Sequence, residues 1–162
     1  MSDLGRDFNT MISHLRPAPW IQSATIDPSS YLPVVDNVSF ESLQADGGGI
    51  VTCINVGYSL SLLEFGITHR DVRVPSLLII DSPRKAAGSN LDDQARGHRT
   101  YQRFQKLAEV HGPQVQLIIA DNDSAPTPGA AFGKIELDYD NPLVPGVAHP
   151  GPEHTHRAED ES

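Results

Sequence analysis

The chain begins with apolar positions at helical spacing. They lie at offsets of 0, 4, 7, 8 and 11 along the sequence and so share one face of a helix: Leu4, Phe8, Met11, Ile12 and Leu15. This pattern predicts a helix over residues 3–15, and the prolines of RPAPW at 16–20 end it because proline lacks the helical hydrogen-bond donor. Short β-branched and aromatic pieces, separated by turn residues, then predict small strands within residues 20–40.

Residues 50–65 are apolar nearly all the way round a helical wheel. The segment is too long for an ordinary strand, so the pattern predicts a helix that is buried on most of its faces. Gly57 lies in the middle of this helix, where glycine costs about 1 kcal/mol relative to alanine. Close packing against a neighbouring element would explain it.

Two continuous apolar runs follow, SLLIID at 76–81 and VQLIIA at 115–120. Such runs are typical of strands covered on both faces, as in a parallel sheet. An amphipathic helix over about 92–111 lies between them, and Gly112 with Pro113 ends it. The order strand–helix–strand predicts a right-handed parallel crossover. The fold class is therefore α/β, a parallel sheet flanked by helices, with small strands near the N-terminus.

Composition and charge limit the classes of partner. The 162 residues contain 12 Lys and Arg against 21 Asp and Glu, a net charge of −9, which argues against broad binding of a phosphate backbone by this chain alone. The one cysteine, Cys53, excludes an internal disulfide and is expected to pack as a small apolar residue. No apolar run approaches the roughly 20 residues of a membrane span, and the N-terminus lacks a signal-peptide core, so we expect a cytoplasmic protein without membrane contact.

The C-terminal part divides into a last strand and a tail. The segments KIELDYD and PLVPGV predict an edge strand. Residues 148–162 carry one Arg against four acids and almost nothing apolar, so we expect a disordered and dispensable tail. His154 and His156 lie in this tail and are expected to be solvated. The organised domain would then cover residues 1–147.

Asp81 is the first candidate for chemistry. It ends a run of four aliphatic residues at the carboxyl end of a predicted parallel strand, where open α/β sheets place their ligands. This arrangement matches the Walker B pattern, in which the carboxylate holds Mg²⁺. The alternative is that Asp81 caps the strand or forms a turn, which is common for short motifs of this kind.

Two further groups of residues are candidates for binding. Gly47, Gly48 and Gly49 precede the buried helix, and free backbone N–H groups at a helix start bind anions; the alternative is a flexible entry loop. Asp121, Asn122 and Asp123 follow the second strand. They form either a loop turn or a set of polar groups beside Asp81, because neighbouring parallel strands end at the same edge.

The order of these parts resembles the C-terminal half of an ATPase head of the structural-maintenance-of-chromosomes and RecN superfamily, a branch of the ABC-type P-loop ATPases. LQADGGG with helix 50–65 corresponds to the signature segment, LLIID to Walker B, SPRKAAGSN to the D-loop and LIIADND to the switch. The resemblance implies that ATP and Mg²⁺ are cofactors. It also implies that Asp81 holds the metal, that Ser82 and Asn122 occupy the positions of the catalytic base and the switch residue, and that Gly47–Gly49 contact phosphate.

The chain also departs from the family pattern. Asp46 stands where the signature has serine, Ser82 where a water-activating glutamate follows Walker B, and Asn122 where histidine is common. No G-x-x-x-x-G-K-[ST] loop occurs, so the lobe that carries Walker A is missing. The resemblance therefore implies a partner polypeptide or second head that bears Walker A, with DNA reached only through that assembly.

Three hypotheses of function follow. The chain is the C-terminal lobe of an ATPase that binds and hydrolyses ATP with a partner or a missing N-terminal lobe, in DNA maintenance or defence. Alternatively, it is a non-catalytic interaction module that keeps the fold. The third hypothesis is an unrelated α/β domain that binds a nucleotide or phosphate ligand, since fold alone does not determine function. Under the first hypothesis the isolated chain has no ATPase activity.

Overall fold

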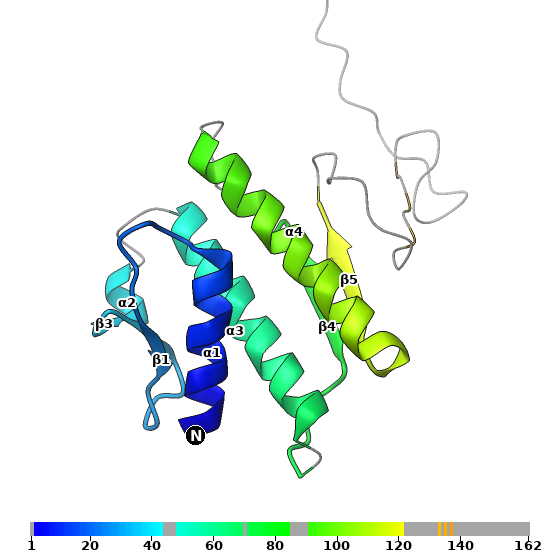
Figure 1. The fold of residues 1–162 in the computed structure, drawn as a ribbon, viewed down its shortest axis with the longest axis horizontal. Coiled ribbons are helices and arrows are strands. Elements are labelled where there is room, and N and C mark those ends of the chain that lie inside the picture. The colour runs from blue at the N-terminus through cyan, green and yellow to red at the C-terminus, as the bar shows by residue number, and fades with distance from the viewer. Residues whose placement is uncertain are drawn as a thin grey trace, which may run out of the picture. The chain divides into compact units, whose positions relative to one another are not determined.

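The computed structural model describes residues 2–43, 48–69, 71–84 and 91–121, together with 133, 135 and 137. The chain divides into two units, Met1–Ala131 and Phe132–Ser162, and the regular elements belong to the first. It is a mixed α/β structure (Figure 1) with the elements α1 Ser2–Leu15, β1 Ala24–Ile26, β2 Pro33–Val35, β3 Val38–Ser39, α2 Phe40–Leu43, α3 Gly48–Thr68, β4 Leu77–Asp81, α4 Leu91–His111, the 3₁₀ turn η2 Gly112–Gln114, and β5 Gln116–Ala120.

The first region packs α1 between α3 and a small antiparallel sheet. The strands pair in the order β1–β2–β3, with Ala24 opposite Val35 and Val35 opposite Val38. The predicted helix at residues 3–15 and the predicted small strands are thus confirmed. A buried cluster joins α1, the sheet, α2 and α3 and forms the core of this region: Leu4, Phe8, Ile12, Ala24, Ile26, Val35, Leu43 and Ile54.

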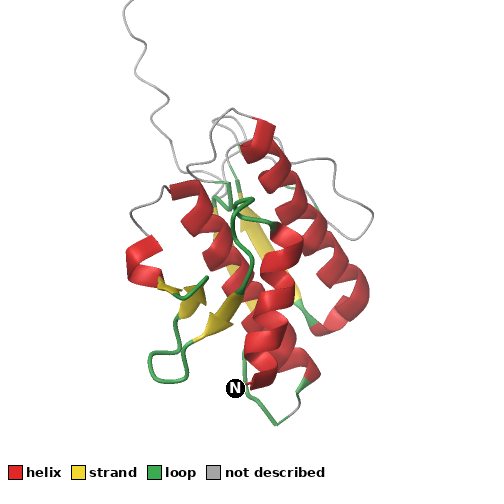
Figure 2. Ribbon diagram, turned by 60° about the vertical axis from the view of Figure 1, so that its left-hand side comes forward, coloured by secondary structure: helices red, strands yellow, loops and turns green. Residues whose placement is uncertain are grey.

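The predicted helix is confirmed as α3, but it is less buried than predicted: seven of its 21 residues are buried, and most of the others are partly exposed. It begins two residues earlier and ends three later than the predicted 50–65. A Cβ atom on Gly57 would lie 3.0 Å from the Cδ1 atoms of both Ile12 and Leu15, so glycine lets α1 approach closely and the expected close packing is confirmed. By length and mean hydropathy α3 is also a candidate membrane span, contrary to the expectation that no run is long enough. In this fold α1 and α4 pack against it (Figure 2).

Strands β4 and β5 form a second sheet of two parallel strands. Ile79 lies opposite Ile118 and Asp81 opposite Ala120 in the register, and α4 connects the two strands. The parallel pairing and the intervening helix were predicted and are confirmed. Within the described residues only one face of the two strands is covered, so the predicted cover on both faces is not found there. The side chains of Leu78 and Ile80 turn toward the helices. Leu77, Ile79 and Ile118 point to the other face of the sheet, and their side chains are 45%, 63% and 44% exposed.

Charged side chains of α4 attach it to the other helices. Arg99 Nε donates to the carbonyl oxygen of Leu15 at 2.8 Å, and Arg96 Nε donates to that of Pro17 at 2.7 Å. These guanidinium groups satisfy carbonyls at and just beyond the end of α1, where helical partners are missing. Arg103 forms an ion pair with Glu64 of α3. The last turn of α1 and the middle of α4 are therefore fixed to each other.

Several sequence expectations concern residues outside the described part of the chain. These are the tail at 148–162, most of the predicted edge strand in KIELDYD and PLVPGV, and the domain boundary at 147. Ile135 and Leu137 are described and exposed, and neither lies in a strand. The boundaries of the domain and of the tail stay predictions.

Candidate functional site

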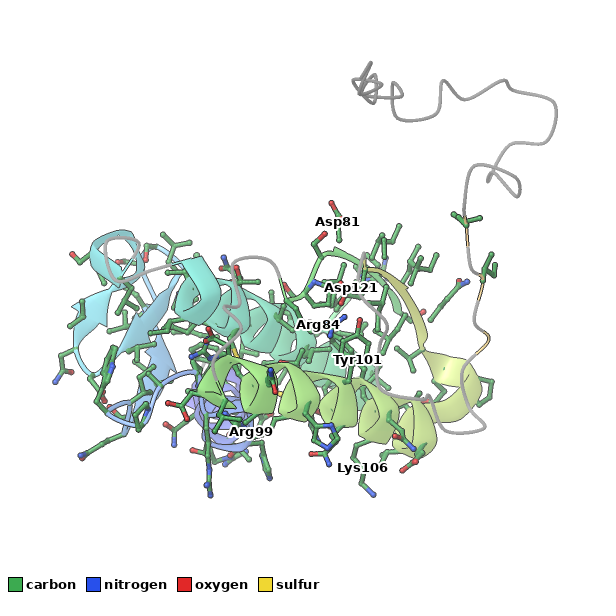
Figure 3. All side chains as sticks on the ribbon, turned by 90° about the horizontal axis from the view of Figure 1, so that it is seen from above. Asp81, Arg84, Arg99, Tyr101, Lys106 and Asp121 are labelled. Atoms are coloured by element: carbon green, nitrogen blue, oxygen red, sulfur yellow. The ribbon has the colours of Figure 1, made fainter. Side chains whose placement is uncertain are left out.

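Asp81 is the last residue of β4, and its side chain is exposed on the face of the sheet that turns away from α4 (Figure 3). The next residue, Ser82, has a left-handed backbone with φ of 52°. Its N–H donates to the carbonyl oxygen of Ala120 at 2.8 Å, which adds one hydrogen bond beyond the end of the strand. Its hydroxyl donates to Asp81 Oδ1 at 2.9 Å. The turn thus holds one oxygen of Asp81, and the carboxylate stays accessible.

Asp121 follows β5 and has a different environment. Arg84 Nε donates to Asp121 Oδ2 at 2.8 Å, and the hydroxyl of Tyr101 donates to the same oxygen at 2.6 Å. The guanidinium carbon of Arg84 lies 5.4 Å from the centre of the Tyr101 ring. Burial and then the hydrogen bond to Asp121 raise the pKa of Tyr101 above its usual range. We call Arg84, Tyr101 and Asp121 the clasp, because they join the loop after β4, helix α4 and the end of β5.

Gly97 makes room for the clasp. A Cβ atom at this position would lie 2.9 Å from Cδ of Arg84, so the arginine stem lies directly against the backbone of α4. A cavity of about 10 Å³ lies beside it, lined by Gly49, Cys53, Pro83, Arg84, Arg96, Gly97 and Thr100. This volume holds one water molecule at most and excludes a nucleotide. The start of α3 and the loop after β4, two of the predicted site segments, therefore meet at this cavity.

The prediction that Asp121 lies beside Asp81 is correct only in part. The two residues lie at the same edge of the sheet, because Asp81 is opposite Ala120 in the register. Successive residues of a strand point to opposite faces, so Asp121 turns toward α4 while Asp81 turns away from it. Figure 3 shows Arg84, Tyr101 and Asp121 together between the strands and α4, with Asp81 on the other side. The two carboxylates therefore do not share one site.

The glycine cluster is placed differently from the prediction. Gly48 and Gly49 are the first two residues of α3 rather than a loop before it, and Gly47 lies outside the described residues. Gly48 is exposed, and its carbonyl oxygen accepts a hydrogen bond from the hydroxyl of Thr52 at 2.7 Å. The first N–H groups of a helix lack helical partners. The exposed start of α3 therefore presents backbone N–H groups of the kind that bind anions.

Asn122 and Asp46 also lie outside the described residues, as do residues 85–90 of the predicted D-loop. Cys53 is confirmed as a buried apolar residue, 2% exposed, and burial raises the pKa of its thiol to about 11. A thiol of this kind is not a nucleophile at neutral pH. Of the predicted catalytic residues, the described part of the chain therefore contains Asp81 and Ser82.

The residues present limit what metal could bind. Within the described residues no group of three or more His, Cys, Asp or Glu side chains is placed to hold an ion. Asp81 alone is suitable for Mg²⁺, which is commonly held by one or two carboxylates together with water and the phosphates of a substrate. Among the described residues, Asp81 would supply one carboxylate to a magnesium ion that arrives with a nucleotide.

Sequence reasoning did not identify Arg84 and Tyr101 as partners of Asp121. The amphipathic helix predicted over about 92–111 includes Tyr101, but its pattern assigns this residue no partner. The available signal was Gly97, four residues before Tyr101 on the same helical face, because glycine inside a helix indicates a close approach by another group.

Comparison of the chain with models of protein families, with curated proteins and with solved structures found no match.

Proposed function

We propose that this chain is the C-terminal lobe of an ABC-type ATPase head and acts with a second lobe that carries the phosphate-binding loop. The observation that supports this most is the position of Asp81. It is exposed at the carboxyl end of a parallel strand, and no cationic side chain in the described ranges forms an ion pair with it. The neighbouring Asp121, in contrast, is 10% exposed and paired with Arg84. The structural role of a strand-end acid belongs to Asp121, which leaves Asp81 available for a ligand.

Under this proposal, each candidate residue has a limited task. Asp81 would hold the Mg²⁺ that accompanies ATP, and the first N–H groups of α3 would contact phosphate. Asn122 would orient a phosphate oxygen or a water molecule through its amide. Ser82 cannot serve as a general base, because a serine hydroxyl is too weak a base near neutral pH. Its hydroxyl also already donates a hydrogen bond to Asp81. Turnover by the complex is therefore expected to be slow.

The rate of phosphate release from ATP tests this proposal directly. The tagged chain is used to isolate its partner from the native host, and the partner is identified by mass spectrometry. We expect a polypeptide with a G-x-x-x-x-G-K-[ST] loop, no hydrolysis by the chain alone, and Mg²⁺-dependent hydrolysis by the complex. Asp81→Asn should abolish that hydrolysis, while Asp92→Asn, which removes an equal charge from an exposed position of α4, should leave it unchanged.

Two results would contradict the proposal. One is robust hydrolysis by the isolated chain, which would require a nucleotide site that the chain forms by itself. The other is a partner without the phosphate-binding loop. A complex that hydrolyses ATP regardless of Asp81 would favour the second candidate, a non-catalytic interaction module. The hydrogen bond of Ser82 to Asp81 and the closed clasp around Asp121 support that candidate.

A further inference from the structure

Three ionisable side chains connect the second half of α4 with the last two turns of α3. Arg103, a permanent cation, forms an ion pair with Glu64 through its Nη2 and the carboxylate Oε2. The other oxygen of the same carboxylate, Oε1, lies 3.5 Å from Nε2 of His111, the last residue of α4. We call Glu64, Arg103 and His111 the latch, because they join the ends of the two helices.

The latch is incompletely hydrogen-bonded. Nε2 of His111 and Nε of Arg103 are both buried, and neither has a hydrogen-bond partner among the described residues. The side chain of His111 is only 10% exposed, and 3.5 Å is too long for a strong hydrogen bond from its ring to Glu64. A buried polar group without a partner costs free energy. The contact between His111 and Glu64 is therefore the weakest part of the latch.

We propose that the latch is a pH-dependent switch: a proton on His111 holds the end of α4 against α3, and loss of this proton loosens that end. Histidine is the side chain whose charge ordinarily changes between about pH 5 and 8. A protonated ring carries a hydrogen on Nε2, which donates to Glu64 as a charge-assisted hydrogen bond. A neutral ring has one hydrogen only, and the tautomer that carries it on Nδ1 directs a lone pair at the carboxylate.

The surrounding charges determine the direction of the switch. Glu64 attracts a cation on His111, and so do the carbonyl groups at the end of α4, which have no helical partners. Arg103 opposes protonation of His111, but its charge is already paired with Oε2 of the same carboxylate. Acid therefore strengthens the contact as long as Glu64 stays ionised. The stabilisation is lost as the pH rises and His111 becomes neutral.

The other ionisable groups near this end of the two helices have different surroundings. His69, just after α3, stacks on the ring of Phe65 with the ring centres 3.9 Å apart. The segments that follow His111, η2 and β5, contain no charged residue. Four further charged residues nearby in sequence are exposed, and none of them forms an ion pair with His111 in the part of the chain that the structure describes: Asp71, Arg73, Lys106 and Glu109. The proton on His111 therefore acts on Glu64.

Hydrogen exchange of backbone amides tests the latch in the full chain, because it measures the local opening of a helix end. Exchange is followed by mass spectrometry at about pH 5.5 and about pH 7.5, on the two sides of the usual charge change of histidine, with correction for the chemical exchange rate at each pH. Peptides from residues 105–111 report on the latch, and peptides from residues 4–12 of α1 are the internal reference. We expect the protection of residues 105–111, relative to the reference, to be about fivefold greater at the lower pH.

Two variants assign the effect to named side chains. His111→Gln keeps a polar side chain that cannot be protonated, and Glu64→Gln removes the charge that attracts the proton, so each should reduce the difference between the two pH values to less than about twofold. His98→Gln is the matched control and should keep the full difference, because His98 is an exposed histidine of the same helix. Nuclear magnetic resonance of the imidazole rings in the wild-type chain needs no variant. We expect His111 to lose its proton over the same pH range in which residues 105–111 lose protection.

The inference is overturned if residues 105–111 are equally protected at both pH values, or better protected at the higher one. It is also overturned if His111→Gln or Glu64→Gln keeps the full difference, or if His98→Gln abolishes it. Titration of the His111 ring outside the pH range in which protection changes would overturn it as well. None of these results bears on the ATPase proposal, because no residue of the latch is among the candidate residues for ATP or Mg²⁺.

Discussion

The two sheets of this protein differ in how their outward faces are built. The antiparallel sheet of β1, β2 and β3 buries Ala24, Ile26 and Val35 against α1 and presents Thr25 to solvent. The parallel sheet of β4 and β5 buries Ile80 on one side and exposes Ile79 and Ile118 on the other. Antiparallel sheets commonly have one face exposed to solvent, whereas parallel sheets are ordinarily covered on both faces. Among the described residues, the two sheets therefore differ in the outward face: a threonine is exposed in β1, and aliphatic side chains are exposed in β4 and β5.

The first region should be the most sensitive to loss of a core side chain. Phe8 is fully buried in the cluster that joins α1, the antiparallel sheet and α3. We expect Phe8→Ala to lower the free energy of unfolding by about 4 kcal/mol, since the cavity it leaves cannot collapse fully. Leu77→Ala, at a 45% exposed position of β4, should cost less than about 1 kcal/mol. Urea denaturation measures both, and equal losses would contradict the distinction between the two regions.

The clasp should be the most sensitive polar feature of the second region. Arg84 and Asp121 are 19% and 10% exposed, so removal of the arginine leaves a largely buried carboxylate without its cation. We expect Arg84→Met to lower the free energy of unfolding by about 3 kcal/mol. Arg73→Met, which removes the same charge from an exposed position, serves as the control and should change stability by less than about 0.5 kcal/mol. Similar losses in the two variants would show that net charge and not the clasp is responsible.

The pH dependence of the free energy of unfolding tests whether Cys53 is buried where α3 packs against α4. Burial raises the pKa of its thiol from 9.0 to about 11. The unfolded chain loses this proton first, so the stabilisation is complete below about pH 9 and is lost as the pH rises toward 11. The loss should be about 2–3 kcal/mol. Cys53→Ala should remove this part of the pH dependence, and the measurement is the difference between the two stability curves. Parallel curves from pH 8 to 11 would refute the burial of the thiol.

Tyr101→Phe should give the smallest effect. The substitution removes one hydrogen bond to Asp121, which keeps Arg84 as its partner, so we expect a loss of about 1 kcal/mol at neutral pH. The raised pKa of Tyr101 stabilises the fold below the pKa of an unfolded tyrosine and less as the pH rises above it. The loss caused by Tyr101→Phe should therefore shrink in alkaline solution. Tyr31→Phe, at a 60% exposed position, is the control and should have no such effect.

Periodicity was sufficient for the three long helices and for the order of β4, α4 and β5, but it did not predict the short helix α2. The apolar stripe of α1, the continuous apolar length of α3 and the order of β4, α4 and β5 each follow from local pattern, and Gly57 correctly indicated the close approach of α1. Local pattern did not determine whether β4 and β5 are buried on both faces. An apolar run indicates that a strand is suited to burial, but it does not show whether the covering element belongs to the same stretch of chain.

The candidate site could be predicted only as far as the edge of the sheet. Asp81 and Asp121 were expected at that edge, and both lie there. Their separation onto opposite faces depends on register, because Asp81 is opposite Ala120 and Asp121 is one residue further. The partners of Asp121 come from a loop and a helix 37 and 20 residues away in sequence, and no local pattern pairs them. Whether Asp81 holds Mg²⁺ with a nucleotide stays a prediction.

The central claim, that within the described residues helices cover one face of the parallel sheet and leave the other exposed, is tested most directly by two adjacent substitutions. Ile79 is 63% exposed and Ile80 is 9% exposed, and they differ only in the face to which they point. The measurement is the free energy of unfolding of Ile79→Asp and of Ile80→Asp in urea. We expect a loss of about 1 kcal/mol for the first, because aspartate is disfavoured in strands, and of more than about 3 kcal/mol for the second, which buries an unpaired charge. Equal, large losses would mean that the chain covers both faces itself and would contradict the account.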